Sequence, residues 1–312
     1  MFAENAGSWM PDPTFLKDAI REGGGAVVGL EEADGIVWCG PSTPSVVREV
    51  VGRAPDLRWV QLPMAGVERF TASFGDDELR AADGRPLVWT SAKGAASAVV
   101  AEHALGLMLA GLRNLIEFSR ADDWLPQSGR SLIGANVTIL GAGGITESLL
   151  ALLAAFEVRA TVVRKRPAPV AGAVRVLGID QLDLALADAD VVVVALALTN
   201  ETKGIIDATA LRAMRGDSWL VNVARGEHVV TEDLVAALSA GVIGGAALDV
   251  TLPEPLPAGH PLWQLRNCIV TPHVGSTRDM ARPHLAQRVR DNVRRFAAGQ
   301  PLLGVVDSTL GY

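Results

Sequence analysis

The sequence predicts an α/β protein with two doubly wound parallel-sheet domains, and three observations point to it. Short apolar, β-branched segments alternate with helix-period segments along the 312 residues, as in parallel α/β sheets. A glycine-rich turn, Gly141 to Gly144, directly follows one of these segments. Near Thr90 the small alternating elements give way to a long apolar helix. We therefore expect one domain before this point, a second after it, and a cleft between them.

The composition fits an enzyme and argues against several other classes. The chain has 28 basic and 35 acidic residues, net charge −7, so it should not attract nucleic acid or an anionic membrane. The longest apolar stretch, residues 95–112, is interrupted by Glu102 and His103, and the first ten residues do not resemble a signal peptide. Cys39 and Cys268 lie in apolar runs, which favours buried thiols in a reducing compartment. The predicted location is the cytoplasm.

Four short strands predict the first domain. They are expected at Ala26–Val28, Ile36–Trp38, Trp59–Leu62 and Leu87–Trp89. After the third comes a small-residue loop, Pro63-Met64-Ala65-Gly66-Val67. Open α/β sheets bind ligands at the carboxyl ends of their strands, so this loop is a candidate binding site. An ordinary turn is the alternative.

One long helix is predicted from Ser97 to Phe118. Apolar side chains cover most of its faces, so the helix must be covered on more than one side. Core packing is one explanation, and a two-fold dimer interface is the other. We expect the dimer interface.

The second domain is predicted to be a sheet of six strands. They are expected at Val137–Leu140, Ala160–Val163, Val191–Ala195, Trp219–Val223, Ala246–Val250 and Ile269–Thr271. Thr231 is predicted to cap a helix that ends before Gly241. The last helix should start with Pro283 in its first turn and stop at Gly299. It is expected to bury Leu285, Val289, Val293 and Phe296.

The segment N-V-T-I-L-G-A-G-G-I-T-E-S is predicted to bind a dinucleotide. Its strand leads into Gly141, Gly143 and Gly144, which allow a tight turn into a helix that begins near Ile145. Such a turn brings a pyrophosphate close to the main chain, where the amides of the helix N-terminus face its charge. Thr146 replaces the third glycine of G-x-G-x-x-G, so a plain connecting turn is the alternative.

Three polar residues follow late strands: Arg225 after L-V-N-V-A, Glu254 after A-L-D-V-T-L-P, and His273 after C-I-V-T-P. Because strand ends collect the ligand in a doubly wound sheet, we expect them to converge on one cleft. Arginine can hold a carboxylate with two hydrogen bonds, histidine transfers protons near neutral pH, and a neighbouring glutamate favours the charged imidazole. Each residue alone is explained by a surface or loop role, but the three together favour catalysis.

Six motifs follow one another in order along the second domain. They are G-A-G-G-I-T, L-T-N-E-T-K-G-I-I, L-V-N-V-A-R-G, G-G-A-A-L-D-V-T-L-P-E-P-L-P, H-P-L-W and T-P-H-V-G-S. This order resembles the D-isomer-specific 2-hydroxyacid dehydrogenases, of the glyoxylate/hydroxypyruvate reductase type. The resemblance implies a substrate domain (1–92, completed by 282–312) and a Rossmann NAD(P)-binding domain (93–281), both of the Rossmann-like/flavodoxin-like, doubly wound type. It also implies hydride transfer between NAD(P)H and a small 2-oxo or D-2-hydroxy acid, usually by a homodimer.

The resemblance assigns roles to individual residues. Arg225, Glu254 and His273 would be catalytic, and no metal is implied. The cofactor would contact Gly141, Gly143, Gly144, Ile145, Leu198, Thr199, Val223, Asp249 and Gly275. Among these, Asp249 and the backbone of Val223 would hold the nicotinamide carboxamide. The substrate would bind to the amides of Ala65, Gly66 and Val67 and to Arg225 and His273.

The sequence departs from the family at three places. Thr146 stands at the third glycine position, which predicts a cofactor helix slightly away from the sheet. Ala197 replaces a common proline, and only Phe2 and Ala3 remain of the amino-terminal strand. The substrate side chain is not indicated, and its pocket candidates are chosen by position alone. They are Met64, Trp124 and His284.

The second strand of the cofactor domain predicts a preference for NADPH over NADH. In such sheets an acid about 20 positions after the first glycine binds the ribose of NAD, whereas a nearby arginine accommodates the phosphate of NADP. This strand ends Val162-Val163-Arg164-Lys165-Arg166, without an acid. Arg164 can bind a phosphate with two hydrogen bonds, while Lys165 and Arg166 add charge. A solvated basic loop is the alternative.

Two other functions are considered. One is D-3-phosphoglycerate dehydrogenase of the same family, without a regulatory domain because the chain ends at Tyr312. The other is a nucleotide-sensing binding protein that resembles the C-terminal-binding corepressors, which keep the same three catalytic residues.

Overall fold

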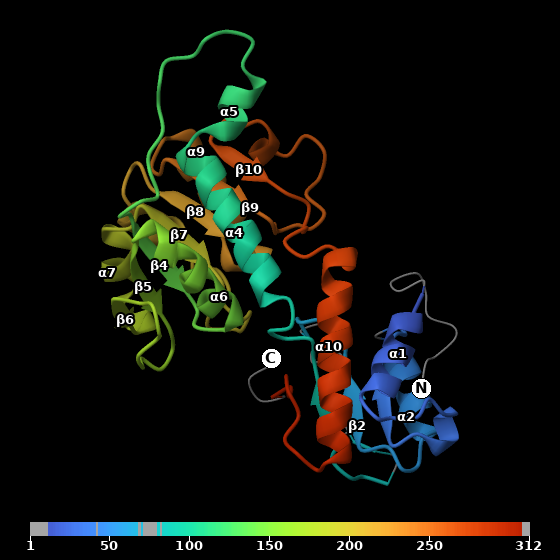
Figure 1. Cartoon of the computed structure of the whole chain (residues 1–312). Helices are drawn as coiled ribbons and strands as arrows, with labels where there is room; N and C mark the ends of the chain where they lie inside the picture. Colours follow the sequence, from blue (N-terminus) through green and yellow to red (C-terminus); the bar gives the residue numbers. More distant parts are fainter. Residues whose placement is uncertain (1–11, 42, 68–69, 71–79, 82, 308–312) are drawn as a thin grey trace. The chain divides into compact units, whose positions relative to one another are not determined.

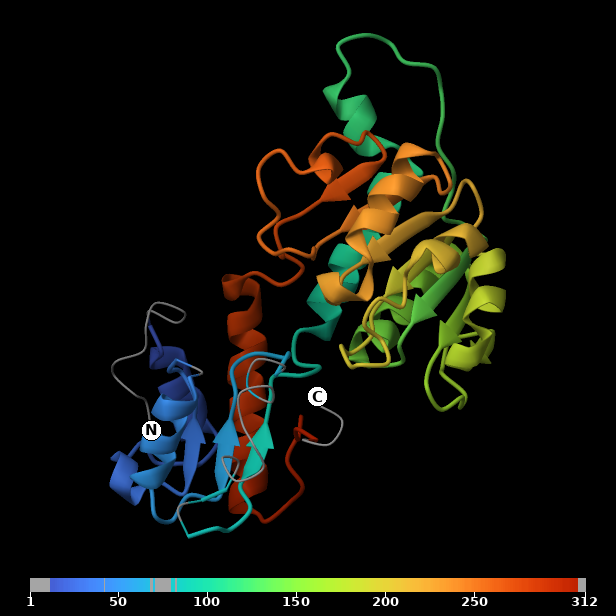
Figure 2. The same ribbon diagram turned by 180° about the vertical axis from the view of Figure 1, so that it is seen from behind.

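The computed structural model of the chain describes residues 12–41, 43–67, 70, 80–81 and 83–307 (Figures 1 and 2). The chain forms two compact units: unit 1 comprises residues 1–96 and 277–312, and unit 2 comprises residues 97–276. Phe2 and Ala3, which we considered as the remnant of a strand, lie outside the described residues.

Unit 1 contains a three-stranded parallel sheet of order β1-β2-β3. Its strands are β1 (Gly35–Val37), β2 (Trp59–Gln61) and β3 (Val88–Thr90). The predicted strand Ala26–Val28 was wrong, because this segment pairs with no strand of the sheet. Its apolar Val27 instead packs in the cluster between the sheet and the last helix.

Helices lie on both faces of this sheet. They are α1 (Thr14–Glu22), the 3-10 turn η1 (Leu30–Glu32), α2 (Pro44–Gly52) and α10 (Arg278–Ala297). Side chains of α1 and α10 share one apolar cluster with Trp59, and those of α2 share another with Val60. Successive side chains of β2 point to opposite faces of the sheet. Trp59 therefore packs against the helices on one face and Val60 against the helix on the other.

The last helix starts earlier than its proline suggested. Thr277 is the N-cap, and its hydroxyl accepts a hydrogen bond of 3.4 Å from the Met280 amide. Pro283 therefore lies inside α10, so its prediction as a first-turn residue was wrong. Gly299 follows the helix with φ 63°, as predicted. Of the four expected core residues, Leu285, Val289 and Val293 are buried and Phe296 is partly buried.

Unit 2 contains a seven-stranded parallel sheet of order β10-β9-β8-β7-β4-β5-β6. Its strands are β4 (Asn136–Leu140), β5 (Arg159–Val163), β6 (Arg175–Leu177), β7 (Val191–Val194), β8 (Trp219–Asn222), β9 (Gly245–Leu248) and β10 (Cys268–Val270). All six predicted strands are present, and β6, a short edge strand that begins with an arginine, was missed. The order reverses between β4 and β7, so the glycine turn after β4 lies at the switch point.

Helices cover both faces of this sheet in the two views (Figures 1 and 2). They are α4 (Ser97–Leu112), α5 (Leu115–Arg120), α6 (Gly144–Leu153), α7 (Leu182–Ala187), α8 (Ala208–Ala213) and α9 (Thr231–Ser239), with 3-10 turns η3 (Ala154–Phe156), η4 (Ile179–Gln181), η5 (Gly226–His228) and η6 (Pro261–Trp263). The cores separate accordingly, with α4 and α6 on one face and α7, α8 and α9 on the other. This is the predicted doubly wound fold.

The predicted long helix is broken into α4 and α5. Asn114 has φ 50°, a left-handed conformation that ends the first helix. The small Gly111 of α4 lets Trp219 of β8 approach, because a Cβ at this position would lie 2.4 Å from the Trp219 ring. Part of the apolar surface of α4 is thus buried within its own unit. The segment around α5 extends away from the sheet (Figure 1).

Both cysteines are free, as predicted. Burial raises the pKa of Cys39 to about 11 and that of Cys268 to about 12, so neither thiol is a reactive thiolate at neutral pH. Within the described ranges, no helix is long and apolar enough to cross a membrane.

Candidate active site

The glycine turn after β4 has the shape that an anion site requires. Gly141 has φ 110°, and a Cβ there would lie 2.4 Å from the carbonyl oxygen of Ala195, just beyond β7. Only glycine permits this close approach. Gly143 is the N-cap of α6 without a side-chain cap, and a Cβ on it would meet nothing within 4 Å. The N-terminus of α6 is therefore open on the side of Gly143, and helix N-termini of this kind bind anions.

Thr146 occupies the third glycine position without leaving a polar group unsatisfied. Its side chain is fully buried, and its hydroxyl donates a hydrogen bond of 2.9 Å to the carbonyl oxygen of Gly141. The threonine is thus accommodated in the contact between α6 and β4, and it also fixes the glycine turn.

The basic segment after β5 lies at the carboxyl edge of the sheet. The amide of Arg164 donates a hydrogen bond of 3.0 Å to Leu177 of β6. Lys165 Nζ contacts both carboxylate oxygens of Glu201, at 2.8 and 2.7 Å. Glu201 comes from the loop after β7, and sequence reasoning did not consider it. Because both side chains are exposed, this ion pair is weak and can rearrange.

The loop after β7 forms a closed turn beside the glycine turn, since β7 pairs with β4. The amide of Thr199 donates a hydrogen bond of 2.9 Å to Thr202 Oγ1, and this hydroxyl donates one of 2.8 Å to the Ala197 carbonyl oxygen. Leu198 and Thr199, both predicted cofactor contacts, are thus held at the switch point. Alanine replaces proline at position 197 without opening the turn.

A buried asparagine shapes the turn that carries Arg225. Asn222 Nδ2 donates a hydrogen bond of 2.8 Å to the Arg225 carbonyl oxygen, and Asn222 Oδ1 accepts one of 3.0 Å from the Ala224 amide. Arg225 Nη1 donates one of 2.7 Å to the Ala224 carbonyl oxygen. Val223, a predicted cofactor contact, is buried at the start of this turn.

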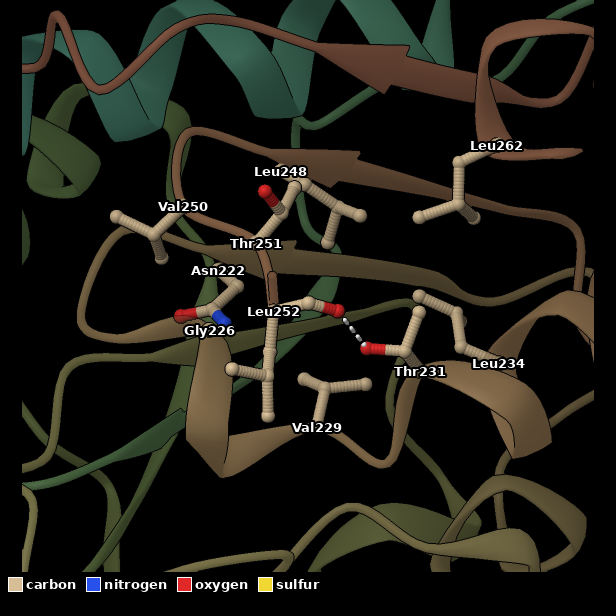
Figure 3. Close-up of a pocket in the computed structure, with 10 residues that line it drawn as sticks. All are labelled: Asn222, Gly226, Val229, Thr231, Leu234, Leu248, Val250, Thr251, Leu252 and Leu262. Carbon is tan, nitrogen blue, oxygen red and sulfur yellow. Dashed lines mark hydrogen bonds between the residues drawn. The ribbon is translucent and has the colours of Figure 1, made fainter. Parts of the chain in front are cut away.

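The turn after β8 packs against the loop after β9. A Cβ on Gly226 would lie 2.0 Å from the carbonyl oxygen of Thr251, so glycine is required for this contact. Both residues line a largely apolar pocket (Figure 3). The turn that carries Arg225 is thus in direct contact with the loop that leads to Glu254.

Thr231 contributes to the same contact. Its hydroxyl donates a hydrogen bond of 2.7 Å to the Leu252 carbonyl oxygen (Figure 3). Val230 is the N-cap of α9, so the predicted capping role of Thr231 was wrong. The Thr231 hydroxyl donates to the loop after β9 and not to the helix, because the carbonyl group of Leu252 lies next to it.

Glu254 and His273 form a direct pair. Glu254 Oε1 lies 2.8 Å from His273 Nδ1, with the side chains 43% and 50% exposed. Solvent or a ligand can therefore reach both side chains. Because Nδ1 faces Glu254, a ligand would contact the other ring nitrogen, Nε2. His273 has φ 53°, a conformation that costs energy in a non-glycine residue. Its amide donates a hydrogen bond of 2.8 Å to the Asp249 carbonyl oxygen.

The carboxylate of Asp249 is the centre of a second cluster. It is 3% exposed and accepts hydrogen bonds from the Thr271 hydroxyl at 2.6 Å and the amides of Val274 and Gly275 at 2.9 and 2.8 Å. His103 Nε2 lies 3.2 Å away. Burial raises the pKa of Asp249, but these hydrogen bonds outweigh burial and lower it to about 2. Asp249 is therefore ionised at neutral pH.

Sequence reasoning missed two members of this cluster. Thr271 was assigned to the end of a strand, and His103 was noted only as an interruption of an apolar stretch. A polar side chain in an otherwise apolar helix was the available signal for His103.

The predicted substrate-binding loop and the three pocket candidates lie in unit 1 or after α5. The loop Ala65–Val67 follows β2 in unit 1, with Val67 buried. Met64 packs against the core of that unit, His284 lies on α10, and Trp124 is 93% exposed after α5. Among the described residues, no group of three or more acidic, cysteine or histidine side chains could hold a metal ion.

Comparisons with known proteins agree with this arrangement. The profile "D-isomer specific 2-hydroxyacid dehydrogenase, NAD binding domain" matches residues 105–275. A glyoxylate reductase of Thermofilum pendens is 31% identical over 268 residues, which cover 83% of this chain and 77% of the relative. A glyoxylate/hydroxypyruvate reductase A of Serratia proteamaculans is 31% identical over 215 residues, 68% of each chain.

A solved structure extends the likeness to the whole chain. The D-isomer specific 2-hydroxyacid dehydrogenase of Xanthobacter autotrophicus, in complex with NADPH and MES, superposes with a TM-score of 0.82 at 29% identity. The match covers 100% of this chain and 98% of that one. The chain belongs to the D-isomer specific 2-hydroxyacid dehydrogenase family. It is therefore an oxidoreductase with a nicotinamide cofactor.

Proposed function

We propose that this chain reduces a small 2-oxo acid of the glyoxylate or hydroxypyruvate type to the D-2-hydroxy acid, with NADPH as the preferred reductant. The observation that carries the proposal is the pair of Glu254 and His273, 2.8 Å apart at the same sheet edge as the glycine turn. The two reductases among the relatives support the substrate class.

Residues of unit 2 would hold the cofactor. Its pyrophosphate would lie against Gly143, Gly144 and Ile145, where the N-terminus of α6 is open. Leu198 and Thr199 would border it from the loop after β7, and Val223, Asp249 and Gly275 would surround the nicotinamide. When bound, the cofactor supplies the hydride that adds to the carbonyl carbon.

The chain's own residues would supply binding and proton transfer. The guanidinium of Arg225 would bind the substrate carboxylate and polarise the carbonyl oxygen. His273 would donate the proton from Nε2 to that oxygen as the alcohol forms. Glu254 accepts from Nδ1, so it would orient the ring towards the substrate. In the direction of oxidation, Nε2 would accept the proton of the hydroxyl group.

Unit 1 would be the substrate domain. We propose that the amides of Ala65, Gly66 and Val67 bind the substrate carboxylate. The position of this loop after β2, at the carboxyl edge of a parallel sheet, supports the assignment.

The key experiment is a substrate panel combined with His273→Gln. The wild type should reduce glyoxylate or hydroxypyruvate faster than phenylpyruvate and 3-phosphohydroxypyruvate. His273→Gln should lower turnover on the order of a hundredfold or more, with cofactor binding retained. His260→Gln is the control, because this histidine lies in the same unit outside the pair. Near-normal turnover of His273→Gln would refute the mechanism.

The same panel separates the two alternatives. Fastest turnover of 3-phosphohydroxypyruvate would favour a phosphoglycerate dehydrogenase. Background turnover of every oxo acid, with measurable cofactor binding, would favour a nucleotide-sensing binding protein. The relatives named above favour neither alternative.

The preference for NADPH rests on the basic segment after β5. Arg164 would bind the 2′-phosphate with two hydrogen bonds, and Lys165 and Arg166 would add charge. The NADPH complex of the Xanthobacter autotrophicus structure supports this choice. The wild type should therefore use NADPH more efficiently than NADH, and equal or better use of NADH would refute the preference.

Arg164→Asp should lower the ratio of the two efficiencies by about tenfold or more, because a charged hydrogen bond to phosphate is lost. Arg159→Asp is the matched control: it makes the same charge change at the opposite end of β5. An unchanged ratio in Arg164→Asp would show that another residue discriminates.

We further propose a homodimer in the cytoplasm. The apolar side chains of α4 that are not buried in unit 2, and the exposed Leu115 and Trp124 near α5, favour a second copy as the cover. Sizing with light scattering at micromolar concentration should give twice the chain mass, and a monomer would contradict the proposal.

A further inference from the structure

His228 is a buried titratable residue that the proposed mechanism does not use. It lies in the 3-10 turn η5, three residues after Arg225, and its side chain is completely buried. Its ring reaches two parts of the site. Nδ1 lies 3.3 Å from the Arg225 amide nitrogen, and Nε2 lies 3.3 Å from the carbonyl oxygen of Ala197.

One protonation state of the ring satisfies both contacts. The Ala197 carbonyl can only accept, so Nε2 must carry a hydrogen. In a neutral imidazole, Nδ1 is then an acceptor and takes the hydrogen bond of the Arg225 amide. Nδ1 also lies 3.1 Å from the Arg225 carbonyl oxygen, which accepts from Asn222 at 2.8 Å, but in this neutral form Nδ1 has no hydrogen to donate. The Ala197 carbonyl oxygen also accepts from Thr202 Oγ1 at 2.8 Å, and its second lone pair takes the hydrogen of Nε2. Burial lowers the pKa of His228, which favours this neutral form.

Backbone hydrogen bonds hold the same two loops independently of the ring. The Gly204 amide donates to the Glu227 carbonyl at 2.8 Å, and the Ile206 amide donates to the His228 carbonyl at 2.9 Å. These bonds remain when the side chain is changed. What the imidazole adds is a direct connection between Arg225 and residue 197, next to Leu198 and Thr199.

We propose that His228 is a positioning residue that fixes the main chain of Arg225 through Nδ1 and the cofactor loop at Ala197 through Nε2. The inference rests on the proposed function, because it gives each half of the ring a task in that reaction. Through Nδ1 the ring sets the direction of the Arg225 side chain, and through Nε2 it sets the loop that borders the cofactor.

Two conservative substitutions separate these tasks. In His228→Asn the amide oxygen lies near the place of Nδ1 and can accept from the Arg225 amide, but the side chain is too short to reach Ala197. In His228→Gln the amide nitrogen lies near the place of Nε2 and can donate to Ala197, but Nδ1 has no substitute. His228→Leu lacks both contacts.

The test measures turnover and cofactor binding separately. Binding of NADPH without substrate is measured by quenching of tryptophan fluorescence, and kcat and KM for the preferred oxo acid are measured at saturating NADPH. His228→Asn should weaken NADPH binding by about tenfold and change kcat little, since one buried hydrogen bond is lost. His228→Gln should bind NADPH nearly normally and lose about tenfold in kcat. His228→Leu should show both losses.

His260→Asn and His260→Gln are matched controls. Nδ1 of His260 also accepts a backbone amide in a 3-10 turn, that of Leu262 at 3.3 Å, but the ring does not contact the Arg225 turn. Both variants should leave NADPH binding and kcat unchanged.

The opposite results are equally clear. Parallel losses of binding, kcat and thermal stability in the Asn and Gln variants, or their failure to fold, would show that the ring serves only the core. Unchanged constants in both variants would also overturn the inference. An inactive wild type would refute the proposed function instead. In that case the NADPH-binding difference between the two variants would still test the contact at Ala197.

Discussion

The carboxylate of Asp249 accepts a hydrogen bond of 2.8 Å from the backbone amide of Gly275, two residues beyond His273. The neighbouring Val274 amide donates to the same carboxylate at 2.9 Å. His273 has a positive φ of 53°, and these bonds hold the segment that follows it. A buried ionised carboxylate thus organises the main chain around the proton donor of the proposed reaction.

Asp249→Asn should change how stability depends on pH. The pKa of Asp249 is lowered from 3.8 to about 2, so the carboxylate stabilises the fold above pH 4 and loses this contribution as the pH falls towards 2. The wild type should exceed the variant by ~2 kcal/mol at pH 7, and the gap should narrow below pH 4. Urea unfolding followed by circular dichroism at several pH values measures it.

Asp183→Asn is the control, because it changes an exposed carboxylate of α7. It should follow the pH profile of the wild type. A gap between wild type and Asp249→Asn that stays constant from pH 7 to pH 2 would contradict the role given to the ionised carboxylate.

Gly226→Ala should separate the loops that carry Arg225 and Glu254. The new methyl group would lie 2.0 Å from the Thr251 carbonyl oxygen, so the backbone has to move. We expect a loss of about 2 kcal/mol or more of stability and a loss of turnover. Gly216→Ala, whose Cβ would come no closer than 4.0 Å to a neighbour, should change neither. Normal turnover of Gly226→Ala would show that the loop contact is not needed.

Glu201→Gln should increase the preference for NADPH. Glu201 now neutralises Lys165 at 2.7 Å, and its removal leaves the lysine charge to the 2′-phosphate. Because the pair is exposed, the effect is small: KM for NADPH should fall by about twofold to threefold, while KM for NADH stays constant. Glu157→Gln is the control, because Glu157 lies just before β5, at the amino ends of the strands. An equal change for both cofactors would assign Glu201 a role unrelated to the phosphate.

Glu254→Gln should lower turnover because the ring of His273 loses the partner that orients it. The carboxylate oxygen lies 2.8 Å from Nδ1, and a neutral amide in its place holds the ring less strongly. We expect kcat to fall by about tenfold or more, with NADPH binding unchanged. Steady-state rates and a titration with NADPH measure this, and normal turnover would show that proton transfer does not need the pair.

Local pattern was a good guide to the strands of unit 2 and a poor one to helix boundaries. Buried parallel strands are continuous runs of β-branched residues, so all six predicted strands of unit 2 were found, whereas the short edge strand β6 was missed. Pro283 suggested a helix start, but Thr277 upstream caps the helix. The break at Asn114 depends on one backbone conformation, which hydrophobic periodicity does not register.

The sequence by itself determined the fold class, the family and the residues at the strand ends, including Arg225, Glu254 and His273. These features depend on residues that are close in the sequence, because each parallel strand brings the residue that follows it to the carboxyl ends of the sheet. Tertiary structure alone decided the partners of those residues: His103 beside Asp249, Glu201 beside Lys165, and His228 between Arg225 and Ala197. The contacts of His103 with Asp249, of Glu201 with Lys165 and of His228 with Ala197 join separate loops or elements. Such contacts follow from the order of strands in the sheet, which no local pattern contains.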